Sequence, residues 1–199
     1  MNKIEIEKAA MSVYAKYFKK GKPYDKIHKI MKEEGIVYKE IEADPNEFLG
    51  VLIKSPKGTP CIVINKNIEN IGRKNFTIAH ELGHFVLGHL KQNVSFICRE
   101  RDIFDSSNTK SIQEREANYF ASCFLMQRQR VINEFTRRFR YHLPEVYDKN
   151  KRAFLYINIQ SKQNLHYWIK IESVLTKEFG VSTEALKIRL IDLGLMNNF

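Results

Sequence analysis

The middle of the chain contains an apolar segment with two histidines four residues apart, FTIAHELGHFVLGHL at positions 76–90. Its apolar residues recur at intervals of three and four, which predicts a helix with one buried face. Residues at positions i and i+4 share a helix face, so His80 and His84 would direct both imidazoles to the same point. Two neutral imidazoles one turn apart fit adjacent corners of a tetrahedral zinc site. The segment therefore predicts a metal-binding helix, although two solvent-facing histidines on an amphipathic helix would share this spacing.

A glutamate follows the first of these histidines, which completes the pattern HExxH. Glu81 is rotated by about 100° from His80 around the helix, so it could reach a water on the metal but not the metal itself. A carboxylate in that position can act as a general base toward water that Zn²⁺ has acidified. His89 would lie about 180° from His80 on a continuous helix. We therefore predict that His89 is a bystander and not a ligand.

A catalytic zinc site needs a third protein ligand and an open fourth position. The sequence offers candidates in QEREANYFA at positions 113–121. Glu114 could supply the third ligand, while Asn118, one turn later, could accept a hydrogen bond from the far nitrogen of a ligating histidine. Glu116 faces another side of the helix. From spacing alone, both glutamates could also be ordinary exposed helix charges.

The two segments together resemble the paired signatures of the ImmA/IrrE family of zinc metallo-endopeptidases. The strings are RKNFTIAHELGH at positions 73–84 and EREANYFASCFLMQ at positions 114–127. In the family the second string usually ends in Leu-Leu-Met-Pro, so Phe124 and Gln127 depart from the pattern without touching a ligand. The resemblance covers roughly residues 25–195.

The resemblance implies a thermolysin-like core in which the helix of the third ligand crosses the active-site helix. It favours Glu114 over Glu116 as that ligand, and Zn²⁺ as the metal, although Mn²⁺ or Co²⁺ could occupy the same ligands. It also implies a role in cleaving a helix-turn-helix repressor, encoded nearby, of a mobile element or a stress response.

The rest of the pattern predicts an α+β fold with a zincin-like metallopeptidase core over residues 1–130 and a basic, mostly helical segment over 131–199. The expected helices cover 4–19, 25–34, 76–90, 164–179 and 183–193, and the expected strands cover 36–38, 48–53 and 61–64. The strands form a small mixed or antiparallel sheet. We expect the outer strand of the hairpin over 48–65 to offer an edge to an extended peptide substrate. The last two helices, joined by Gly-Val-Ser, could form a helix-turn-helix with Lys187 and Arg189 on its recognition helix, or a hairpin that packs on the core.

The charge balance is strongly basic, with 33 Lys and Arg against 23 Asp and Glu, a net charge of +10. Half of this excess lies between residues 124 and 152 and could meet an acidic partner protein or nucleic acid, or form a solvated face. Direct nucleic-acid binding is the less favoured interpretation. Three cysteines without a CxxC spacing and the lack of an apolar run of about 20 residues predict a cytoplasmic protein that does not enter membranes.

Two classes of function fit these observations. One is a zinc endopeptidase that cleaves a regulatory protein, with Tyr141 and His142 as candidate stabilisers of the oxyanion by residue type alone. The other is a non-catalytic, antitoxin-like regulator that binds DNA or protein and retains the metallopeptidase fold. Glu81 favours the enzyme, because a protein that only binds has no need of a general base beside a metal. The sequence does not indicate an oligomeric state.

Overall fold

The structure, a computed structural model, describes residues 1–18, 21–91, 95–98, 112–139, 147–148, 153–154 and 162–196. The fold mixes helices with a small sheet, which confirms the predicted α+β class. The chain forms two units, Met1–Leu125 and Met126–Phe199, which are described one at a time. Among the described residues, none of the helices combines the length and hydropathy needed to cross a bilayer.

The sheet of the first unit has four strands in the order β1-β3-β2-β4. Their bounds are Val37–Ile41 for β1, Pro60–Asn65 for β3, Gly50–Lys54 for β2 and Ser95–Cys98 for β4. Strand β1 runs parallel to β3, whereas β2 is antiparallel to both β3 and β4. The sheet is therefore mixed. A turn at residues 55–58 joins β2 to β3, and Gly58 takes the left-handed conformation there (φ 82°).

The substrate edge predicted for the hairpin over 48–65 is wrong. Both hairpin strands have a neighbour on each side, because β1 pairs with β3 and β4 pairs with β2. The outer strands of the described sheet are β1 and β4. Strand β4 has four residues, too few to show a clear period of two in the sequence.

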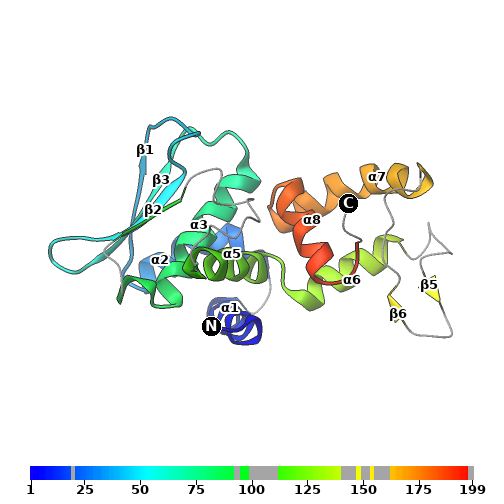
Figure 1. Cartoon of the computed structure of the whole chain (residues 1–199), viewed down its shortest axis with the longest axis horizontal. Coiled ribbons are helices and arrows are strands. Elements are labelled where there is room, and N and C mark those ends of the chain that lie inside the picture. The colour runs from blue at the N-terminus through cyan, green and yellow to red at the C-terminus, as the bar shows by residue number, and fades with distance from the viewer. Residues whose placement is uncertain are drawn as a thin grey trace. The chain divides into compact units, whose positions relative to one another are not determined.

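Helices pack against this sheet and against one another. They are α1 (Lys3–Tyr17), η1 (Pro23–Lys26), α2 (Ile27–Glu33), α3 (Ile71–Val86), η2 (His89–Lys91) and α5 (Ile112–Leu125). Helix α3 packs against β2 and β3 on one side and against α5 on the other, and α1 packs on α5 (Figure 1). The HExxH helix therefore lies between the sheet and the second motif helix.

Helix α3 begins and ends earlier than the sequence predicted. Asn70 caps its N-terminus, where the side-chain oxygen accepts a hydrogen bond from the backbone N–H of Arg73 (2.9 Å). At its other end Gly88 takes a left-handed conformation (φ 76°), so α3 stops at Val86. His89 consequently lies on η2 rather than on α3. Its predicted position on the far side of a continuous helix is therefore wrong.

The close approach of α3 and α5 depends on Gly83. A Cβ atom at this position would lie 3.2 Å from the carbonyl oxygen and 3.3 Å from the Cα atom of Ala117. Since backbone atoms cannot move aside as a flexible side chain can, a larger residue would push α5 away. Gly83 thus allows the first turn of α5 to reach the histidines of α3.

The second unit contains α6 (Arg128–Phe139), β5 (Tyr147–Asp148), β6 (Ala153–Phe154), α7 (Lys162–Phe179) and α8 (Thr183–Asp192). Ser182 caps α8 by accepting a hydrogen bond from the backbone N–H of Ala185 (3.3 Å). In the helix-turn-helix alternative, Arg189 would lie on the recognition helix and face DNA, which its burial contradicts. Arg189 is 1% exposed and donates to the carbonyl of Met126 and to Asp192. Its guanidinium stabilises the unit from inside and cannot contact bases.

Several arginines of the basic stretch are engaged by acidic side chains of the same unit. Arg130 pairs with Glu178 at 3.0 Å, and both Arg137 and Arg138 pair with Glu134. These contacts cancel part of the local positive charge. Arg128 is exposed, and the remaining basic residues of the stretch, Arg140, Lys149, Lys151 and Arg152, lie outside the described residues.

Candidate metal centre

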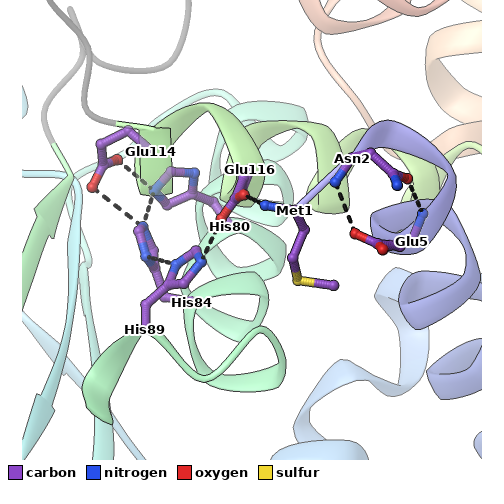
Figure 2. A network of polar contacts seen from close by, with 8 residues as sticks. All are labelled: Met1, Asn2, Glu5, His80, His84, His89, Glu114 and Glu116. Atoms are coloured by element: carbon purple, nitrogen blue, oxygen red, sulfur yellow. Dashed lines mark hydrogen bonds and ion pairs between the residues drawn. The ribbon is translucent and has the colours of Figure 1, made fainter. Parts of the chain in front are cut away.

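Three side chains from α3 and α5 converge on one point (Figure 2). The Nε2 atoms of His80 and His84 are 3.0 Å apart. One carboxylate oxygen of Glu114 lies 3.1 Å from His80 Nε2, and the other lies 3.3 Å from His84 Nε2. Ligands bonded to tetrahedral Zn²⁺ at 2.0–2.1 Å would be about 3.3 Å from one another. The spacing and the chemistry of these three groups therefore fit a zinc ion.

Asn118 fixes the ring of His80. Its side-chain oxygen lies 2.8 Å from His80 Nδ1, and because an amide oxygen can only accept, Nδ1 carries the proton. The lone pair of His80 Nε2 is then free to face Glu114 and His84. This is the contact that the spacing of Glu114 and Asn118 predicted.

His84 is held by a different set of partners. Its Nδ1 lies 2.8 Å from Nδ1 of His89, and Nε2 of His89 lies 3.0 Å from Glu116 Oε2. The other oxygen of Glu116 accepts a hydrogen bond from the amino group of Met1. His89 is outside the group of ligand atoms, as predicted, but it contacts the ligand His84 and so is not the bystander that the helix spacing predicted. The Gly88-His89 pair was the available signal, because a glycine there can end the helix and let the histidine turn back.

The two glutamates of α5 have separate places. Glu114 lies against the histidines of α3, and Glu116 lies against His89. Only Glu114 belongs to the group of ligand atoms that fall within 4.8 Å of one another. The geometry therefore favours Glu114 over Glu116 as the residue that could serve as the third ligand.

The protonation states suit a metal site. Burial lowers the pKa of His84 to about 4, so its imidazole is neutral at physiological pH and has a lone pair for a cation. Burial alone would raise the pKa of Glu114, but its close contacts with the imidazoles of His80 and His84 outweigh this and hold the pKa well below its usual value. The cluster thus combines the neutral imidazole of His84 and the imidazole of His80 with the anionic carboxylate of Glu114.

Glu81 is fully buried beside this cluster. Neither of its carboxylate oxygens has a hydrogen-bond partner of ordinary geometry among the described residues. Burial raises the pKa of Glu81 well above its usual value, the charge of Glu114 adds to this, and the backbone of Leu52 opposes it. A nearby cation would favour the ionised carboxylate. A metal ion held by the three ligands would therefore supply a positive charge close to the buried carboxylate of Glu81.

Strand β2 approaches Glu81 at a glycine. A Cβ atom on Gly50 would lie 3.3 Å from Glu81 Oε1 and 2.8 Å from the methyl group of Thr77. Any larger residue would therefore crowd the carboxylate. Tyr141 and His142, named as candidate oxyanion stabilisers, lie outside the described residues.

Residues 31–191 match the model of a protein family described as peptidase M78, IrrE N-terminal-like domain. The match spans well over half of the chain. The chain belongs to this family. This match agrees with the ImmA/IrrE resemblance and implies a metallopeptidase-type function. A comparison with curated proteins gave no match.

Membership of the M78 family gives the cluster a chemical context. The matched region begins within α2 and ends within α8, so it includes both motif helices. Within the described part of this region, His80, His84 and Glu114 form a group that could hold a metal.

Proposed function

We propose that this protein is a zinc-dependent endopeptidase that hydrolyses a peptide bond in a regulatory protein, a helix-turn-helix repressor of a mobile element or stress response. His80, His84 and Glu114 would hold the zinc, and Glu81 would be the catalytic base. The observation that carries the proposal is the buried carboxylate of Glu81 beside the ligand cluster, for which the described part of the chain offers no hydrogen bond of ordinary geometry. A buried carboxylate without partners is costly to fold, and the cost is explained if the group serves a reaction.

Three protein ligands would leave one position of a tetrahedral zinc ion open. Zn²⁺ held by these ligands would supply Lewis acidity toward a carbonyl and toward water. Glu81 would take a proton from the attacking water and return it to the leaving amine. Its burial and the narrow space beside Gly50 exclude bulk water from the carboxylate, which keeps its interactions strong.

Strand β4 is the better candidate for substrate binding now that the hairpin is excluded. It pairs with β2 from Gly50↔Cys98 to Ile53↔Ser95, and its opposite edge has no partner strand among the described residues. An extended peptide could add there through main-chain hydrogen bonds. This mode requires a flexible or locally unfolded segment, so we expect poor cleavage of stably folded proteins.

The test is cleavage of the repressor encoded beside this chain by wild-type protein, Glu81→Gln and the control Glu69→Gln. Glu69 is exposed and precedes α3, so its change should have no effect. Glu81→Gln should keep its zinc and lower the cleavage rate by about 10²- to 10⁴-fold. Chelation of the metal should stop cleavage by the wild type.

The alternative of a non-catalytic regulator makes the opposite prediction. A Glu81→Gln variant that retains full biological effect would show that catalysis is not the function.

A further inference from the structure

We propose that His89 and Glu116 are positioning residues that hold His84 in the tautomer able to bind metal. The proposal deepens the metallopeptidase function above and rests on it for the identity of the ligands. It assigns a role to the chain of contacts from His84 through His89 to Glu116 (Figure 2).

All three side chains of this chain of contacts are buried. His84 is 0% exposed, His89 5% and Glu116 8%. The contacts are short, 2.8 Å between the two Nδ1 atoms and 3.0 Å from His89 Nε2 to Glu116 Oε2. Buried polar groups that lose a partner are costly, so each contact constrains the next.

One requirement fixes every proton in this chain. If His84 Nε2 is to bind a metal, that nitrogen has no proton, and neutral His84 carries its proton on Nδ1. Nδ1 of His84 must then donate to Nδ1 of His89, which must be the acceptor. Neutral His89 therefore carries its proton on Nε2, where Glu116 accepts it.

Without His89, a competing arrangement is close at hand. His84 Nε2 lies 3.3 Å from an oxygen of Glu114. If His84 moved its proton to Nε2, it could donate to Glu114, and both would then be lost as metal ligands. His89 opposes this tautomer because its Nδ1 accepts a hydrogen bond only when the proton of His84 is on Nδ1. Glu116 in turn keeps the proton of His89 away from that nitrogen.

The two ligand histidines are thus supported differently. His80 donates to the neutral amide of Asn118, whereas His84 donates to an imidazole whose far side meets a carboxylate. Anionic support strengthens the donor character of an imidazole ligand. Removal of His89 should therefore affect metal affinity as well as geometry.

The direct test is the tautomer of each histidine in the unaltered protein, measured by long-range proton–nitrogen NMR with and without Zn²⁺. We expect the proton on Nδ1 in His80 and His84 and on Nε2 in His89. A proton on Nδ1 of His89 would overturn the proposal. In metal-free His89→Ala, the proton of His84 should move to Nε2, and an unchanged tautomer would count against the proposal.

The second test is zinc affinity, measured by competition with a chelator. His89→Ala should weaken zinc binding by about 10- to 100-fold. His89→Asn should restore most of the affinity, because its side-chain oxygen can take the place of the acceptor Nδ1. Glu116→Gln, which retains an acceptor oxygen, should lose less affinity than Glu116→Ala. His28→Ala is the matched control, since His28 is exposed and contacts Tyr38 instead.

Equal affinities for His89→Ala and the wild type would overturn the proposal, and so would a His89→Asn variant as weak as His89→Ala. If His89→Ala does not fold, the tautomers of the wild type and the affinity of His89→Asn still decide. Neither measurement depends on cleavage. Inactivity toward a repressor would therefore count against the proposed function, while these results would stand by themselves.

Discussion

Both units of the protein bury charged side chains, but the two units satisfy them differently. In the second unit, Arg189 is almost fully buried and donates to the carbonyl of Met126 and to Asp192, groups that belong to the same unit. In the first unit, Glu81 is fully buried and has no hydrogen bond of ordinary geometry to the residues that the structure describes, and the nitrogen and oxygen atoms of its neighbours face one another.

The difference distinguishes a buried polar group that stabilises the fold from buried polar groups that are arranged for a reaction. A buried charge surrounded by its own partners stabilises the fold that contains it. Lone pairs that crowd together without a positive charge among them repel one another, and a cation between them would relieve this repulsion. We therefore infer that the first unit carries the metal site, whereas the buried arginine of the second unit stabilises its fold.

The strongest test of this comparison removes the ligands. In the double variant His80→Ala/His84→Ala, only Glu114 of the three ligands remains, and bound zinc should fall from about one ion per chain to none. Elemental analysis of the purified protein measures this, together with manganese and cobalt. His28→Ala should keep its zinc, and full zinc content in the double variant would remove the site assignment.

The second test is directed at the other unit. Arg189→Ala removes a packed side chain and leaves the carbonyl of Met126 without its donor, so the free energy of unfolding should fall by about 2–4 kcal/mol. Urea unfolding followed by circular dichroism measures this. The exposed Arg128→Ala is the control and should change stability little.

Zinc content decides what this second result means. We expect folded Arg189→Ala protein to retain one zinc per chain, because Arg189 supports the second unit and contributes no ligand. Loss of zinc from the folded variant would break the division of roles between the units.

The sequence predicted the site where its signals were local. The placement of His80, Glu81 and His84 on one helix follows from the apolar spacing of residues 76–90, and the i, i+4 relation predicted that Asn118 would serve the same site as Glu114. Glu114 itself needed the family resemblance. Its contact with α3 depends on the tertiary approach of two helices at Gly83, which no periodicity encodes.

Three features of the structure were not predicted, each for a physical reason. His89 was misplaced because Gly88 ends α3 one turn before the apolar pattern does. The edge strand β4 was missed because four residues carry little pattern. The recognition-helix alternative for Arg189 fails because its long apolar stem fits a buried position when the guanidinium finds partners. The first two features depend on short local signals, and the burial of Arg189 depends on tertiary contacts.

The smallest expected effect concerns the ion pairs on α6. Partial burial alone would raise the pKa of Glu134, but its contacts with Arg137 and Arg138 outweigh this and lower it. Because the folded pKa is lowered, the stabilisation is fully present above the usual glutamate value of about 4.3 and is lost as the pH falls through the lower folded value. Since the side chain of Arg137 is 63% exposed, solvent screens the pair, and Glu134→Gln should cost at most about 1 kcal/mol at neutral pH. Urea unfolding at neutral pH and in strong acid, each at low and high salt, measures the difference. It should shrink in acid and in high salt, whereas a cost that persisted in acid would show that packing rather than charge holds Glu134 in place.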